Sequence, residues 1–61
     1  MDKKKLIPKK KYVRRRTVDG KKIESIMECM QITTAGAVFF QGGNLVKLTD
    51  EQIKREVKSI D

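Results

Sequence analysis

This chain of 61 residues contains no histidine and no tryptophan, and it has one cysteine, Cys29, and one proline, Pro8. Without histidine, the usual zinc ligand sets and the most common general acid or base are missing. The acidic residues are not grouped as an oxygen-ligand metal site requires, and no GxxxxGK or HExxH motif is present. We therefore expect a protein that is not an enzyme and that uses no metal or cofactor.

Long apolar runs are also missing. Only Leu6 and Ile7 stand between the first lysines and Pro8, so the chain shows neither a membrane-spanning run nor the apolar core of a signal peptide. A single cysteine excludes a disulfide within the chain, and a reducing, cytoplasmic setting is the simplest expectation. A domain of this length buries only about 60% of the surface of its unfolded chain, so a homodimer is one expected source of further stability.

Charge is plentiful but unevenly placed. Residues 1–22 contain eleven basic and two acidic residues, a net charge of +9, whereas residues 23–61 contain four basic and six acidic residues, a net charge of −2. Nine of these eleven bases fall in three triplets, at 3–5, 9–11 and 14–16, and Lys21 and Lys22 are the other two. Such a block must face water or a polyanion, because it has too few acids nearby to neutralise it.

The chain divides into a tail and one domain. Residues 1–10 are expected to form a flexible basic tail, because Pro8 and five lysines oppose regular structure. The domain then covers residues 11–61 and begins with a hairpin over 12–33, in which Asp19-Gly20 is a favoured pair for a two-residue turn. That turn fixes the register, which places opposite-charge and apolar pairs across the two strands: Arg15 with Glu24, Lys11 with Glu28, Val13 with Ile26 and Tyr12 with Met27.

A helix is the rival interpretation of the second strand. Ile23, Ile26, Met27 and Met30 recur at helical spacing, and Asp19 is a possible N-cap for that helix. The strand is favoured because the turn and the charge pairing agree, and because the β-formers Ile32, Thr33 and Thr34 follow.

A second hairpin is expected over 37–48, with Gly42-Gly43 in its turn. Its register gives two apolar faces, one with Ala37, Phe39, Val46 and Leu48, the other with Val38, Phe40 and Leu45. A capping box at Thr49 to Gln52 then begins a helix over 50–60 whose stripe is Ile53, Val57 and Ile60. That helix covers one face, and the other requires closure into a barrel-like shape or a second copy of the chain. The expected fold is α+β, with about four antiparallel strands and one C-terminal helix.

The basic arm is the candidate functional feature. Flexible lysines neutralise phosphates, strand arginines pair with them in a forked geometry, and a tyrosine ring offers a stacking face for bases. A solvated, solubilising tail and attraction to anionic lipids are the alternatives, the latter weakened because the arm contains no amphipathic helix. No motif for sequence-specific recognition is present. The predicted nucleic-acid-binding residues are Lys3, Lys4, Lys5, Lys9, Lys10, Lys11, Tyr12, Arg14, Arg15, Arg16, Lys21 and Lys22.

Cys29 stands among Met27, Met30 and Ile32. A reactive thiol needs a cationic and exposed setting, whereas a buried thiol needs only apolar neighbours. We therefore expect Cys29 to be a small, unreactive core residue.

The arrangement Lys-Lys-Tyr followed by Ile-Met-Glu-Cys-Met-Gln-Ile-Thr resembles the openings of many small basic accessory proteins of bacteriophages. The resemblance covers about the first half of the chain and carries over no site residues. It implies a protein that binds nucleic acid, or one that binds a host protein and blocks or redirects it. We expect sequence-nonspecific nucleic-acid binding, and the alternative is an inhibitor or adaptor that docks an acidic surface of a host protein.

Overall fold

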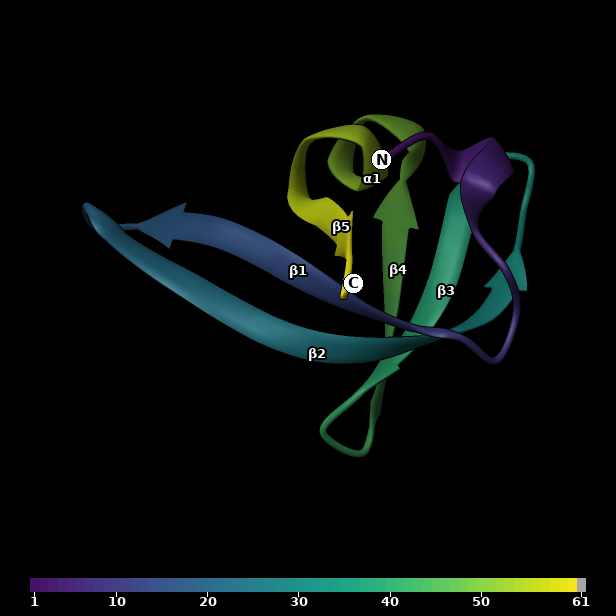
Figure 1. Ribbon diagram of the computed structural model, residues 1–61, viewed down its shortest axis with the longest axis horizontal. Helices are drawn as coiled ribbons and strands as arrows, with labels where there is room; N and C mark the ends of the chain where they lie inside the picture. The colour runs from purple at the N-terminus through teal and green to yellow at the C-terminus, as the bar shows by residue number, and fades with distance from the viewer. Residues whose placement is uncertain (61) are drawn as a thin grey trace.

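The computed structural model describes residues 1–60 and contains one five-stranded antiparallel sheet with a short helix (Figure 1). The strand order is β4-β3-β2-β1-β5, so the last strand pairs with the first, and the sheet is not closed. The α+β class is therefore confirmed, with five strands instead of about four, and the barrel closure is absent. The elements are η1 (Lys3–Lys5), β1 (Lys11–Val18), β2 (Lys21–Ile32), β3 (Gly36–Gln41), β4 (Asn44–Thr49), α1 (Asp50–Glu56) and β5 (Val57–Ser59).

The first hairpin has the register expected from its turn. Tyr12 pairs with Met27, Arg15 with Glu24 and Val18 with Lys21, as a two-residue Asp19-Gly20 turn dictates. Both turn residues have positive φ, 51° and 76°, which Asp and Gly tolerate better than most residues. The rival helix over residues 23–30 is wrong, because pairing with β1 on one side and β3 on the other satisfies the backbone of β2 as a strand.

The second hairpin also has its expected register, with Phe39 opposite Val46 and Phe40 opposite Leu45. Its Gly42-Gly43 turn has positive φ at both positions. The face with Phe39 and Leu48 packs into the core, where both side chains are buried, whereas Phe40 and Leu45 lie 43% and 67% exposed on the outer face. Within one chain the outer face is therefore uncovered.

The C-terminal helix begins as the sequence predicts and ends earlier. The Thr49 hydroxyl accepts a hydrogen bond from the Gln52 N–H, and the Gln52 side chain accepts one from the Thr49 N–H, which completes the capping box. The expected helix over 50–60 stops at Glu56, and Val57–Ser59 pair with Tyr12 to Arg14 as β5. This pairing satisfies edge groups of β1 that a longer helix would leave open.

Residues 1–10 are packed against the domain and do not extend as the expected tail. Leu6 is buried in the core, and the amino group of Met1 lies 3.1 Å from the carbonyl oxygens of both Lys54 and Val57 at the end of α1. The Lys9 N–H donates to the Cys29 carbonyl, and the Cys29 N–H donates to the Lys10 carbonyl. The tail was expected because the segment is rich in lysine. One buried leucine and several backbone hydrogen bonds are nevertheless enough to dock a short segment.

The core contains residues from all five strands, from α1 and from the N-terminal segment, whereas the turns of both hairpins are exposed. No helix among residues 1–60 is long and apolar enough to cross a membrane. Gly36 begins β3 so close to β4 that a β-carbon there would collide with the carbonyl oxygen of Leu48. The core side chains are Leu6, Tyr12, Met27, Cys29, Ala37, Phe39, Leu48, Ile53 and Val57.

Candidate nucleic-acid interface

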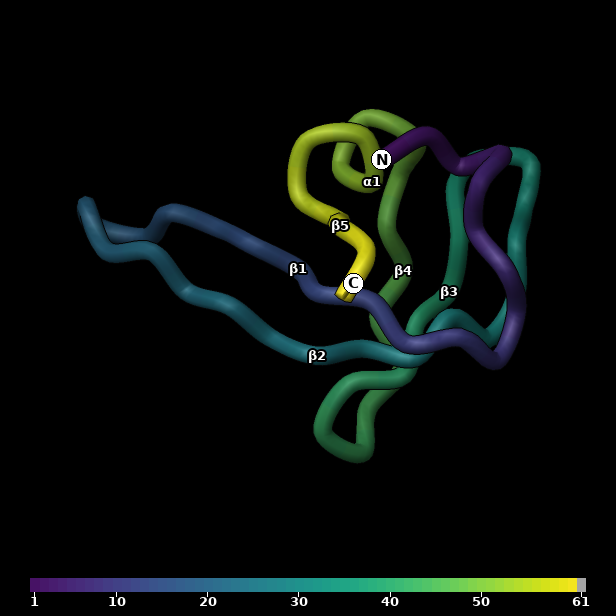
Figure 2. Tube along the Cα trace, in the orientation of Figure 1, coloured from purple at the N-terminus to yellow at the C-terminus, as the bar shows by residue number. Residues whose placement is uncertain are grey.

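The outer half of the first hairpin projects from the body of the protein as a two-stranded ribbon, which we call the ribbon and define as residues 15–24. Figures 1 and 2 show it extending away from the helix and the second hairpin. β5 pairs with β1 only as far as Arg14, and β3 pairs with β2 only from Glu28 onward. Each ribbon residue is exposed. The ribbon is therefore open on both faces and along both edges.

Basic side chains occupy both faces of the ribbon. Neighbouring residues in a strand point to opposite faces, and directly paired residues share a face. Thr17 pairs with Lys22 and Arg15 with Glu24, so Arg15 and Lys22 lie on one face. The other face has Arg16, and also Lys21 opposite Val18. The ribbon thus carries two basic residues on each side.

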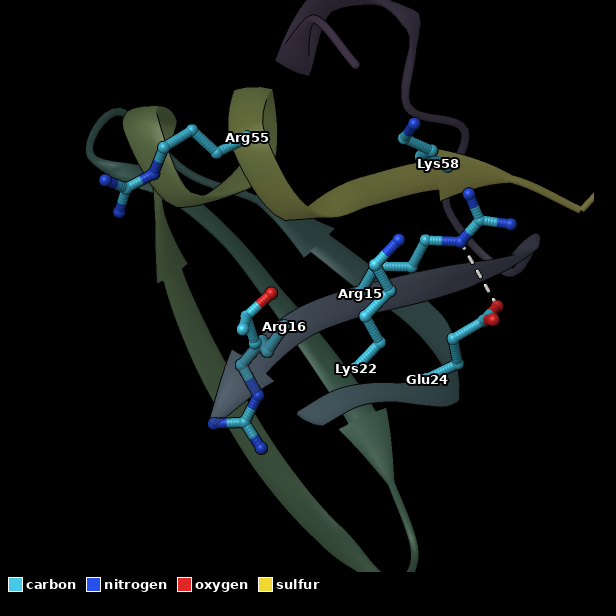
Figure 3. Close-up of a pocket in the computed structure, with 7 residues that line it drawn as sticks. Arg15, Arg16, Lys22, Glu24, Arg55 and Lys58 are labelled. Atoms are coloured by element: carbon cyan, nitrogen blue, oxygen red, sulfur yellow. Dashed lines mark hydrogen bonds and ion pairs between the residues drawn. The ribbon is translucent and has the colours of Figure 1, made fainter. Parts of the chain in front are cut away.

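The base of the ribbon meets the end of α1 and β5 around an open pocket of about 430 Å³. Five basic residues and one acidic residue, Glu24, line this pocket together with Thr17. We call the five bases the basic cluster: Arg15, Arg16, Lys22, Arg55 and Lys58. In Figure 3, Lys58 lies beside Arg15 and Glu24, whereas Arg16 lies farther along β1 and the Arg55 side chain extends from α1 away from the other labelled residues.

Two ion pairs reduce the positive charge of the cluster. Arg15 Nε lies 3.1 Å from Glu24 Oε2, and both side chains are more than half exposed. Water screens such a pair strongly, so it holds Arg15 only weakly and leaves its other guanidinium nitrogens free to bind an anion. Arg55 Nη2 also lies 3.9 Å from Glu56 Oε2, whereas Arg16, Lys22 and Lys58 form no ion pair among residues 1–60.

Three of the predicted site residues are buried or paired within the fold. Tyr12 is buried, and its hydroxyl accepts a hydrogen bond from the Ile7 N–H, so its ring cannot stack on a base. Arg14 turns inward and donates from Nε to Glu56 Oε1 over 2.8 Å. The Lys3 ammonium pairs with Asp50 at 3.1 Å and donates to two backbone carbonyls. These residues stabilise the fold, and their predicted role in binding is not supported by their positions.

The other predicted lysines are exposed but separate from the ribbon. Lys4, Lys5, Lys9, Lys10 and Lys11 are all exposed. η1, which contains Lys4 and Lys5, lies at the opposite end of the molecule from the ribbon tip (Figure 1). The ammonium of Lys10 sits 5.8 Å from the centre of the Tyr12 ring, so it covers that ring on its outer side. The arm and the ribbon therefore do not form one continuous strip as the sequence suggested.

Arg55 and Lys58 belong to the basic cluster, although sequence reasoning did not select them. They stand in the half of the chain with a net charge of −2. Lys58 reaches the cluster because β5 pairs it with Val13, and Arg55 precedes β5 at the end of α1. No local signal marks them, since their position depends on the return of the chain to the edge of β1.

Comparison with protein-family models, with curated proteins and with solved structures finds no match for this chain. The placement of the charged residues is therefore the main indication of function. That placement gives an exposed basic cluster at the base of a projecting hairpin.

Proposed function

We propose that this protein binds nucleic acid without strong sequence preference, through phosphate contacts made by the ribbon and the adjoining end of α1 and β5. The observation that carries the proposal is that five basic residues, from the four elements β1, β2, α1 and β5, line one open pocket with a single acid. Concentrated exposed positive charge of this kind attracts a polyanion and raises its association rate.

The arginines and the lysines of the cluster bind phosphate in different ways. Arg16 and Arg55 present planar guanidinium groups that pair with two phosphate oxygens at once. Lys22 and Lys58 act as flexible point charges that follow the backbone and displace condensed counterions. Such contacts fix the orientation of the protein on the nucleic acid and carry no sequence information by themselves.

The experiment is a fluorescence-anisotropy titration of a labelled random-sequence duplex at several salt concentrations. The double variant Arg55→Ala/Lys58→Ala tests the cluster, because sequence alone would not place these residues in it. We expect a loss of affinity of about tenfold at low salt and a log–log salt slope that is shallower by about two.

The matched control is Lys4→Ala/Lys47→Ala, which removes the same charge from exposed positions outside the cluster. We expect this control to retain most of the affinity. Equal losses in the two variants would show that net charge alone drives binding, and the assignment of the cluster would then be wrong. Absence of binding by the unmodified protein would reject the proposal itself.

The second candidate is an interaction protein, and the outer face of the sheet favours it. Ile26, Phe40 and Leu45 are 63%, 43% and 67% exposed, and the strand registers place all three on this face. Lys11 and Glu28 pair directly across the strands beside them but form no ion pair among residues 1–60. An apolar strip flanked by one base and one acid suits a second copy of the chain, in which each Lys11 faces the other copy's acid.

Sedimentation equilibrium of the protein and of Leu45→Glu tests this candidate. A dimer that the substitution converts to a monomer would support it, and a monomer at all accessible concentrations would reject self-association. A phage accessory role in the cytoplasm fits either candidate. A further alternative is that the basic face docks an acidic host protein. That docking would be measured as salt-sensitive binding to protein without binding to nucleic acid.

A further inference from the structure

We infer that the preferred ligand is double-stranded DNA and that the ribbon enters its major groove. This inference rests on the proposed nucleic-acid binding and adds the form of the nucleic acid and the way in which it is held. Three features of the ribbon carry it: its dimensions, the distribution of bases over both faces, and its lack of aromatic side chains.

The dimensions of the ribbon match those of the groove. Four residue pairs, from Arg15 with Glu24 to Val18 with Lys21, lie beyond the last contact of β1 with β5. At about 3.3 Å per residue, they project about 13 Å from the body. The major groove of B-form DNA is about 12 Å wide and 8.5 Å deep, and it admits a two-stranded β-ribbon. The tight Asp19-Gly20 turn keeps the tip as narrow as the strands.

Charge on both faces distinguishes a groove from a flat surface. A ribbon that lies in a groove has a phosphate backbone on each side, so basic residues are useful on both faces. Arg15 and Lys22 lie on one face, and Arg16 and Lys21 lie on the other. An acidic protein surface would contact one face only and would leave the bases of the other face in solvent. The two-faced pattern therefore favours the groove.

The acidic residues of the ribbon do not oppose this arrangement. Glu24 stands at its base and is paired with Arg15, and Asp19 stands in the turn, at the tip. Beside the base of the ribbon, Arg55 and Lys58 add two positive charges where the walls of the groove would meet the body. The phosphates on either side would thus face more bases than acids.

The absence of aromatic residues argues against single strands. Proteins that hold single-stranded nucleic acid stack its bases on exposed aromatic rings. Residues 15–24 contain no aromatic side chain. Tyr12 and Phe39 are buried, and Phe40 lies on the second hairpin. Duplex RNA is disfavoured for a different reason, because its major groove is too narrow and deep for side chains to read.

The first test compares one sequence as duplex DNA, duplex RNA and single-stranded DNA at the same salt concentration. We expect duplex DNA to bind about tenfold or more tightly than the other two. Equal or tighter binding of single-stranded DNA or duplex RNA would overturn the inference and leave the proposed function standing. Failure to bind any of the three would instead reject the proposed function.

The second test asks whether both faces make contact. Arg15→Ala/Lys22→Ala removes the bases of one face, and Arg16→Ala/Lys21→Ala removes those of the other, with the same change in charge. We expect each double variant to lose duplex affinity to a similar extent and to reduce the salt slope by about two. A loss confined to one of the two variants would show that the ribbon lies on a surface by one face, and groove insertion would be wrong. Lys4→Ala/Lys47→Ala again serves as the charge-matched control.

Discussion

Arg14 Nε donates a hydrogen bond to Glu56 Oε1 over 2.8 Å, which ties the middle of β1 to the last residue of α1. Both side chains are largely shielded from water, at 11% and 18% exposure. The contact gives Arg14 a structural role and leaves its neighbours Arg15 and Arg16 at the start of the exposed ribbon. It also positions Arg55, the residue before Glu56, at the basic cluster.

Removal of one partner of this pair leaves a poorly hydrated charge. We expect Glu56→Ala to lower the free energy of unfolding by about 1–3 kcal/mol, because the Arg14 guanidinium loses its acceptor. Glu24→Ala is the matched control, since Glu24 also pairs with an arginine but is exposed, and its effect is expected to stay below about 1 kcal/mol. Urea denaturation measures both, and equal effects would contradict the structural role of Arg14.

The packing of the N-terminal segment predicts a second result. Leu6→Ala should lower the free energy of unfolding by about 2–3 kcal/mol, because Leu6 is 4% exposed within the core. Ile7→Ala is the control, as Ile7 is 56% exposed and should cost much less. If thermal unfolding showed the two variants to be alike, residues 1–10 would behave as the tail that the sequence first suggested.

Gly36 offers a test of the close approach between β3 and β4. A β-carbon at this position would overlap the Leu48 backbone, so Gly36→Ala must displace one strand or abolish folding. Gly42→Ala has open space around it but a positive φ of 56°, and it should cost only about 1 kcal/mol. Circular dichroism melting of the pair would contradict this account if Gly42→Ala were the more damaging substitution.

Cys29 is expected to be unreactive in the folded protein. Its side chain is fully buried, and burial raises the pKa of the thiol above its ordinary value. Modification by a thiol reagent at about pH 8 should therefore be slow until urea unfolds the chain. Rapid modification without denaturant would show that the core opens readily around β2.

The same raised pKa of Cys29 has a consequence for stability. The unfolded chain releases the thiol proton at a lower pH than the folded chain does. The contribution of the protonated thiol to the free energy of unfolding is therefore fully present below the pKa of the unfolded chain. That contribution is lost as the pH rises through the folded pKa. Urea denaturation of the protein and of Cys29→Ala at a series of pH values measures this effect, and a pH dependence that is identical in the two proteins would contradict it.

The fold was largely predictable where short turns determine the register. Both two-residue turns set their strand pairing, and the alternation of residues then separated Phe39 from Phe40 correctly. The same register held a signal for the burial of Tyr12, because it places Tyr12 opposite Met27 in an apolar pair. The sequence analysis instead interpreted Tyr12 as a stacking residue, because it lies within a run of basic residues.

The candidate site was less predictable because it depends on contacts between distant parts of the chain. Arg14 is removed from the surface by a residue 42 positions away, and Lys58 reaches the cluster only through the pairing of β5. Triplets of like charge in the sequence suggested one basic arm. In the fold, the lysines of η1 lie away from the ribbon, and Arg55 and Lys58 lie beside its base.

The most direct test of the central claim is the salt dependence of binding between the unmodified protein and a labelled DNA duplex. A basic cluster of five residues, in which Arg15 is paired with Glu24 and Arg55 with Glu56, predicts binding at low salt that weakens with a log–log slope of about −3 to −5. No binding at low salt, or binding that is indifferent to salt, would contradict the claim that this surface holds phosphates.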